Sequence, residues 1–344
     1  MKRRKKSKIA VYITVTYVMA YSLFIATKVY FGERIDLRAA SKSLFIPSGA
    51  TMEDVADSLV SARIAVGREK FLRYAALNGF VNVKSGHYVV KRNSTYRQMI
   101  SMLNQGRQTP VNLVISGNIR TKEKLAEIIS GQLEADSSEL VVLLNDSAFL
   151  AELGFDVSNG ILLFMPDTYN VYWNRDARRL FRDMKNLYDR FWNASRTAKL
   201  EAAKLSREGA MILASLAMEE TAKYGELSRI AGVFVNRLHR GMLLQSDPTV
   251  KYAVGDFSLR RVLKSHTETD SPYNTYMYKG LPPGPICIPS RRIVDAVLDY
   301  EHHDYLYFCA KSDFSGSHVF AKTLQQHNQN ASAYRSELNK RKIF

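Results

Sequence analysis

The chain has 344 residues, which is long enough for two domains and a large core. Its formal net charge of +16 predicts an anionic neighbour, such as nucleic acid, a membrane surface or an acidic polymer. Two cysteines, Cys287 and Cys309, exclude a disulfide scaffold and lack metal-ligand spacing. We expect buried free thiols, although the two could pair if the chain lies outside the cytoplasm.

The amino terminus has the pattern of a membrane anchor. A basic cluster over residues 2–8 precedes residues 9–27, which carry no charge. At about 1.5 Å per helical residue, this stretch nearly matches a hydrocarbon core of about 30 Å. A cleaved signal peptide is the alternative, but the apolar run is long and no convincing small-residue cleavage site follows. We expect a transmembrane anchor over 9–31, a cytoplasmic basic tail over 1–8 and the rest of the chain outside.

A charged stalk over 32–42 and a small α+β module over 43–108 are expected next. Thr51 and Thr95 each have a residue three positions on, Asp54 and Gln98, that can complete a capping box. Each box precedes an apolar run with helical spacing. The expected elements are the strands 44–46 and 86–90 and the helices that begin after Thr51, near Phe71 and after Thr95.

Residues 109–344 predict a larger, mostly helical α+β domain. Its aromatic stretch 163–169 is interrupted by Pro166 and fits either the wall of a sugar-binding groove or a packed loop. The histidines lack the spacing of a metal site, and neither a metal nor another cofactor is expected. The predicted elements are a strand over 111–115, helices over 124–133, 137–144, 178–192 and 227–240, and a hairpin of 305–308 with 316–320.

An apolar helix over 211–221 ends in two adjacent acids, Glu219 and Glu220. Residues three, four and seven apart share a helix face, so Glu220 lies on the apolar face and Glu219 is rotated away from it. A carboxylate among apolar side chains is desolvated, which raises its pKa toward the range that suits a general acid at neutral pH. The alternative is that one or both acids face water at the end of the helix.

Polar and aromatic residues follow this helix in two segments. Asp247-Pro248 predicts a helix N-cap followed by proline at the first helical position, which leaves Gln245 and Ser246 free to face a cleft. The second segment lies before a loop that its prolines and glycines hold in a defined shape. It contributes the rings and the amide of Tyr273, Asn274 and Tyr276, residue types that commonly hold carbohydrate.

The order of separated motifs resembles that of the MltG-type (YceG-like) endolytic murein transglycosylases. Any one of these motifs is weak evidence, whereas their common order is specific. The resemblance spans residues 43–334 and adds the amino-terminal anchor. The motifs are Gly86-His87-Tyr88, Pro166-Asp167-Thr168, Leu213-Ala214-Ser215, Glu220-Thr221, 233–238, 241–250, 273–276, 280–284 and His327-Asn328.

The resemblance implies a LysM-like module at 43–108 and a transglycosylase domain at 109–344. It implies cleavage of the MurNAc–GlcNAc bond within nascent peptidoglycan strands, which leaves 1,6-anhydro ends and helps to terminate elongation. It further implies a single-pass protein of the bacterial inner membrane that works beside peptidoglycan synthases.

The resemblance also places the catalytic acid on Glu220. The family's Glu-Lys-Glu-Thr reads Met218-Glu219-Glu220-Thr221 here, and Met165 stands where the family tends to have tryptophan. Six residues are the candidates for substrate binding: Gln245, Ser246, Asp247, Tyr273, Asn274 and Tyr276.

Three alternatives remain at this point. The first is a membrane-anchored peptidoglycan-binding protein with an inactive catalytic domain. The second is a nucleic-acid binder, which is suggested by charge alone and disfavoured because the expected topology is extracytoplasmic and no nucleic-acid motif is present. The third is a hydrolase in which Asp247 activates water.

Overall fold

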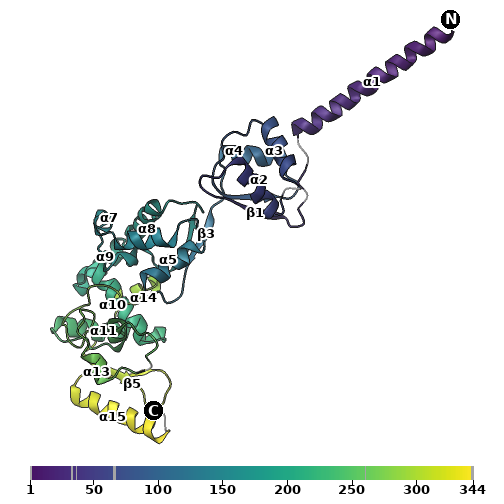
Figure 1. Cartoon of the computed structure of the whole chain (residues 1–344). Helices are drawn as coiled ribbons and strands as arrows, with labels where there is room; N and C mark the ends of the chain where they lie inside the picture. Colours follow the sequence, from purple (N-terminus) through teal and green to yellow (C-terminus); the bar gives the residue numbers. More distant parts are fainter. Residues whose placement is uncertain (1, 32–33, 36, 65–66, 260, 342–344) are drawn as a thin grey trace. The chain divides into compact units, whose positions relative to one another are not determined.

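A computed structural model describes residues 2–31, 34–35, 37–64, 67–259 and 261–341 (Figure 1). Helices predominate over three small two-stranded sheets in this part of the chain, so the predicted α+β class is confirmed. The chain divides into two compact units. Unit 1 consists of Met1–Leu113, Gln132–Glu134 and Asn170–Arg175, and unit 2 of Val114–Gly131, Ala135–Tyr169 and Asp176–Phe344.

Helix α1 covers Lys2–Phe31 and includes both the basic cluster and the uncharged stretch. Within the part of the chain that the structure describes, no helix has the length and apolar character that a membrane span requires. The side chains of residues 2–10, 26 and 28–31 lie outside that part. The basic tail at 1–8 and the anchor at 9–31 therefore stay predictions.

The core of unit 1 lies between a two-stranded antiparallel sheet and helices. Strand β1 (Ser41–Ile46) pairs antiparallel with β2 (Gly86–Lys91), with Leu44 opposite Tyr88. The helices are α2 (Met52–Ser61), α3 (Arg68–Leu77) and α4 (Tyr96–Gln105). The expected capping boxes precede α2 and α4, because the Thr51 and Thr95 hydroxyls accept from the backbone N–H groups of Asp54 and Gln98.

Part of the segment expected to be a stalk belongs to this core. Ile35 and Leu37 are 1% and 2% exposed and pack in the same cluster as Tyr88. The Ile35 N–H also donates to the Ser94 carbonyl at 2.7 Å. The described residues before β1 are therefore part of the folded module, which the charge of the segment did not indicate.

Strands β3 (Val111–Ile115) and β4 (Asp167–Val171) form the second sheet, and the residues of each strand are divided between the two units. Directly before β4, Phe164 and Met165 are buried. The apolar and aromatic side chains of the stretch 163–169 are thus packed, whereas Asp167 and Thr168 are exposed. The helices that follow β3 along the chain, apart from those of the site, are α5 (Lys122–Ser130), α6 (Ser137–Asn145), α7 (Ser147–Glu152), η1 (Gly160–Leu163), α8 (Ala177–Phe191), α9 (Ala194–Ala203) and α13 (Lys264–Thr267).

Helix α10 (Arg207–Glu220) is the central element of unit 2. Its residues from Gly209 to Ala217 are all buried, and the Ser206 hydroxyl caps its first turn by accepting from the Gly209 N–H. It packs against α14 (Arg291–Leu298) and α11 (Tyr224–His239), which also contact each other. A helix that is apolar all round has its position fixed by neighbours on every side.

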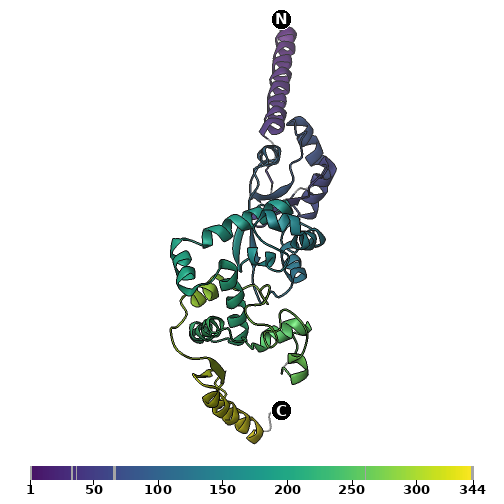
Figure 2. The same ribbon diagram turned by 90° about the vertical axis from the view of Figure 1, so that its left-hand side faces the viewer.

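The carboxy-terminal part of unit 2 is a hairpin with a helix against it (Figures 1 and 2). Strand β5 (Tyr307–Ala310) pairs antiparallel with β6 (His318–Ala321), and α15 (Leu324–Lys340) packs on both strands. The predicted hairpin is confirmed, with its first strand shifted by two residues.

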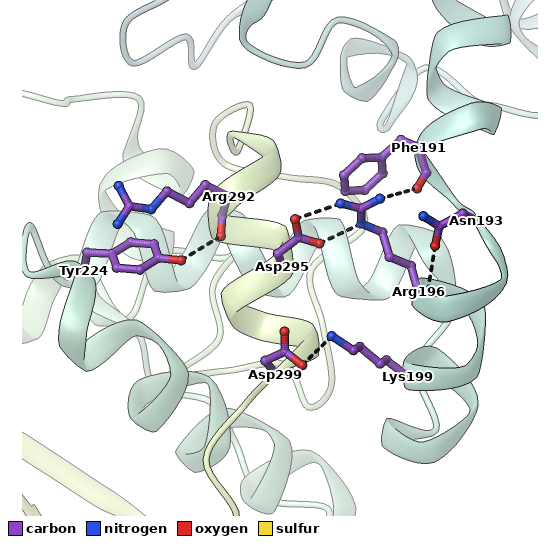
Figure 3. A network of polar contacts seen from close by, with 8 residues as sticks. All are labelled: Phe191, Asn193, Arg196, Lys199, Tyr224, Arg292, Asp295 and Asp299. Carbon is purple, nitrogen blue, oxygen red and sulfur yellow. Dashed lines mark hydrogen bonds and ion pairs between the residues drawn. The ribbon is translucent and has the colours of Figure 1, made fainter.

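Polar contacts join α14 to its neighbours (Figure 3). The Arg196 guanidinium binds both carboxylate oxygens of Asp295, at 2.6 and 2.9 Å, and lies 4.0 Å from the centre of the Phe191 ring. At the C-cap of α14, Asp299 pairs with Lys199 at 2.5 Å. The first pair is bidentate and less exposed, so we expect it to contribute more to stability.

Asp295→Asn is expected to lower the free energy of unfolding by about 1 kcal/mol, because it removes a partly exposed bidentate pair. Asp299→Asn is the matched control on the same helix and is expected to cost less than about 0.5 kcal/mol. Urea denaturation of both variants measures the difference. Equal losses of unfolding free energy in the two variants would show that the Arg196–Asp295 pair stabilises the fold no more than the Lys199–Asp299 pair.

Candidate functional site

Glu220 ends α10 at the wall of a cavity. The residues that precede it on the same face, Leu213, Leu216 and Ala217, are fully buried, as predicted from helix geometry. Glu220 itself is half-buried and lines a cavity of about 470 Å³. Helices α11 and α15, the start of α12 (Asp247–Val254) and the β5–β6 hairpin complete the wall. The lining residues are Glu220, Arg237, Leu244, Gln245, Asp247, Tyr276, Tyr307, Phe308, Cys309, Ala310, His318, Leu324 and His327.

Burial raises the pKa of Glu220 from 4.5 to about 7. The hydroxyl of Ser246 donates to Glu220 Oε1 at 2.5 Å and partly opposes this rise, because it stabilises the carboxylate. The negative charge of Asp247 favours the protonated form. A carboxyl group with a pKa near 7 can both donate and accept a proton at neutral pH.

Ser246 is held in place by buried threonines. It is the N-cap residue of α12, but its hydroxyl caps no helical N–H and bonds to Glu220 instead. Its own N–H donates to Thr275 Oγ1 at 3.0 Å, and its carbonyl accepts from the Thr249 hydroxyl at 2.7 Å. The side chain that would ordinarily stabilise α12 is thus directed at the acid.

Gln245 adopts a left-handed backbone conformation with φ of 51°. Such a conformation costs a residue other than glycine about 1 kcal/mol or more, and it persists where surrounding contacts impose it. Here the N–H of Gln245 donates to the Thr275 carbonyl and its side-chain oxygen accepts from Arg237. The strained turn brings Ser246 to Glu220.

Asp247 is not the N-cap that the sequence predicted. It is the first residue of α12, after Ser246, and its carboxylate accepts a hydrogen bond from the Tyr276 hydroxyl at 2.6 Å. The expected capping bonds from backbone N–H groups are replaced by this contact, which ties α12 to the loop after it. Burial and, to a smaller extent, the contact with Asp247 raise the pKa of Tyr276.

The six predicted binding residues fall into two groups. Gln245, Asp247 and Tyr276 line the cavity, and Ser246 contacts Glu220. Asn274, in contrast, is fully buried, and its amide nitrogen donates to the Thr267 and Thr269 carbonyls while its oxygen accepts from the Tyr276 N–H.

Tyr273, the last of the six, packs against Tyr252, with ring centres 4.7 Å apart and ring planes tilted by 39°. It does not belong to the cavity lining that contains Glu220. Asn274 and Tyr273 thus shape the loop that carries Tyr276.

Glu219 points to a different partner from Glu220, in line with its predicted rotation off the apolar face. Its carboxylate accepts from Arg120 at 2.9 and 3.2 Å and from Asn118 at 2.5 Å. The Arg120 guanidinium also lies 5.0 Å from the centre of the Phe257 ring. Glu219 is therefore committed to an ion pair that joins the end of α10 to the segment after β3.

Sequence reasoning missed four residues of the cavity lining: Arg237, Tyr307, His318 and His327. Arg237 belongs to the family motif 233–238, but the sequence analysis assigned it no role in the site. His318 bonds Glu226 through Nδ1 at 2.9 Å. The apolar neighbours of Arg237 on its helix were a usable signal, because a buried cation requires a specific reason.

Comparison with known proteins identifies the class to which this fold and site belong. The sequence profile of the YceG-like family matches residues 44–333, and the chain belongs to this family. It is also similar to the solved structure of a protein described as YceG-like from Listeria monocytogenes. That likeness has a TM-score of 0.54 and 28% identity, and it covers 84% of this chain and 98% of the other.

The curated relatives carry an enzymatic name. The chain is 30% identical over 312 residues to the endolytic murein transglycosylase of Bacillus subtilis (strain 168). This match covers 86% of this chain and 85% of that protein. It is 27% identical over 333 residues to the protein of the same name from Streptococcus pneumoniae serotype 2, of which it spans 58%.

Glu220→Gln is expected to stabilise the protein at alkaline pH. The folded state holds the Glu220 proton more tightly than the unfolded chain, so the free energy of unfolding falls as pH rises from 4.5 through about 7. Glutamine removes this loss, and the gain should grow to at most about 3 kcal/mol above the folded pKa. Denaturant titrations at about pH 5 and about pH 8.5 test this dependence.

Glu219→Gln is the control for this experiment. It breaks the Arg120 pair and is expected to destabilise the protein at both pH values. A gain for Glu220→Gln that does not change with pH would contradict a raised pKa.

Proposed function

We propose that the chain is an endolytic peptidoglycan lytic transglycosylase. The observation that carries the proposal is a carboxyl group in a cavity, Glu220, whose pKa is raised to about 7 and which is held by Ser246. The YceG-like family and the names of the curated relatives support the substrate, the glycan strands of peptidoglycan. The scissile bond joins MurNAc to GlcNAc within a strand.

Protonated Glu220 acts first as the general acid. It donates its proton to the glycosidic oxygen as the bond from that oxygen to C1 of MurNAc breaks, and positive charge develops on the sugar ring. The apolar residues around the acid keep it protonated until substrate binds. Ser246 stabilises the carboxylate that this step creates.

The Glu220 carboxylate then acts as the general base. It takes the proton from the C6 hydroxyl of the same MurNAc, and the C6 oxygen bonds to C1 to close the 1,6-anhydro ring. The leaving GlcNAc keeps the proton from the first step, and the acid is restored. No water is consumed.

The cavity side chains beside the acid fit sugar recognition. Gln245 offers an amide, and Tyr276 a ring and a hydroxyl, close to Ser246 and Asp247 on the wall that carries Glu220. Hydrogen-bonding groups of this kind suit the acetamido and hydroxyl groups of the two sugars. Tyr273 and Asn274 contribute by fixing the loop that presents Tyr276.

Glu220→Gln keeps the shape of the acid but removes its proton, so the formation of anhydro ends should fall by about 10²-fold or more. Glu219→Gln should lose far less, because its carboxylate pairs with Arg120. Mass spectrometry of strand ends released from purified sacculi measures both. An inactive Glu219→Gln beside an active Glu220→Gln would refute the assignment.

We further propose that the chain is anchored in the bacterial inner membrane through 9–31 and that its unit 1 contains a LysM-like module. Support for the anchor comes from the basic cluster followed by uncharged residues. This placement would bring the cavity to nascent strands beside peptidoglycan synthases, where cleavage helps to terminate elongation.

A reporter that is active only outside the cytoplasm, fused after Phe344, is expected to be active. The matched control is the same fusion made to a chain that lacks residues 1–31, which should be inactive. Activity of a cytoplasm-only reporter at Phe344 would contradict the proposed topology.

A further inference from the structure

Arg237 is a buried cation whose charge has no carboxylate partner among the described residues. It is 7% exposed and lines the same cavity as Glu220. Its Nε donates to the Leu306 carbonyl at 2.6 Å, and its Nη1 contacts the Leu243 and Leu244 carbonyls and the Gln245 side chain. Its other terminal nitrogen, Nη2, bonds to no group in the part of the chain that the structure describes.

His327 adds a second unsatisfied group to the same wall. Its ring stacks on Tyr307, with centres 5.3 Å apart, and Arg237 lies 5.0 Å from the centre of that tyrosine ring. The Nδ1 atom of His327 is buried without a hydrogen-bond partner in the described structure. Tyr307 therefore contacts both the Arg237 guanidinium and the His327 ring, whose Nδ1 is unsatisfied, and all three residues line one cavity.

The cavity lining carries charges of both signs. The acids Glu220 and Asp247 come from α10 and α12, whereas Arg237 comes from α11 and His327 from α15. A buried cation that meets only neutral oxygens loses more hydration than it regains. An anionic oxygen of the substrate would compensate for this loss, and a charge-assisted bond to guanidinium is stronger than a bond to a neutral group.

We propose that Arg237, with His327 and Tyr307, binds a carboxylate of the peptide that hangs from the lactyl group of MurNAc. This inference rests on the proposed function, because only a peptidoglycan strand carries an acidic peptide on the sugar beside the scissile bond. The bound peptide holds MurNAc beside Arg237, while C1 of that sugar faces Glu220. The enzyme therefore selects strands by the charge of their peptides.

The direct test compares three uncrosslinked strands of equal length: one whose peptides keep free carboxylates, one whose carboxylates are amidated, and one from which an amidase has removed the peptides and whose newly freed lactyl carboxylates have then been amidated. Anhydro ends are counted by mass spectrometry. The wild-type protein should cleave the first strand with a kcat/KM about tenfold or more above the other two. Equal cleavage of all three would overturn the inference, and no cleavage of any would overturn the proposed function instead.

Arg237→Gln should reduce the preference for free carboxylates to about one, whereas Arg240→Gln, an exposed arginine at the end of the same helix, should keep it. His327→Phe retains the stacked ring and removes the nitrogen, so it should weaken the preference by a smaller factor. Since Arg237 also binds the carbonyls before Gln245, circular dichroism must show that its variant is folded. A folded Arg237→Gln that slows all three strands equally would make the residue a positioning residue and contradict peptide recognition.

Discussion

The burial of one carboxyl group at the end of a buried helix is the constraint on which this site depends. Glu220 is carried by α10, whose residues from Gly209 to Ala217 are buried. The packing that fixes this helix also fixes the depth of the acid in its cavity and hence its pKa of about 7. Stability and acidity thus have the same structural origin, because loosened packing would hydrate Glu220 and lower its pKa.

Three residues around this acid have a backbone conformation or contacts that do not favour local stability. Gln245 has a left-handed backbone, the Ser246 hydroxyl serves Glu220 instead of its own helix, and Arg237 is buried without a carboxylate partner. Each departure from local preference alone would destabilise a fold. Together they direct polar groups into one cavity, as expected where binding or catalysis and not folding selects the residues.

The sequence predicted those features that depend on local periodicity. Helix α10, the different directions of Glu219 and Glu220, and the β5–β6 hairpin follow from spacing along a single segment. The surroundings of Asp247 and Asn274 do not, because their partners are Tyr276 and the carbonyls of a neighbouring loop. An Asp-Pro pair is compatible with aspartate as the N-cap and with aspartate as the first helical residue. Only the contact of Asp247 with the Tyr276 hydroxyl distinguishes the two.

The part of the cavity that contains Arg237 and His327 was not predicted from the sequence, for the same reason. Arg237 has the sequence position of a cation at a helix end, and its burial results from β5 and the 243–245 turn closing around it. His327 lies in a helix that the sequence analysis did not predict. Contacts between segments distant in sequence thus determine one half of the cavity.

The central claim is that Glu220 acts alone, with the C6 hydroxyl of the substrate as nucleophile. Asp247 is the second acid in the cavity. Its carboxylate accepts a hydrogen bond from the Tyr276 hydroxyl, and because the residue is exposed it can also contact a water molecule. Digestion of sacculi in water enriched in heavy oxygen distinguishes the two mechanisms. The account predicts anhydro ends without label, whereas labelled reducing ends as the main product would contradict it and assign the activation of water to Asp247.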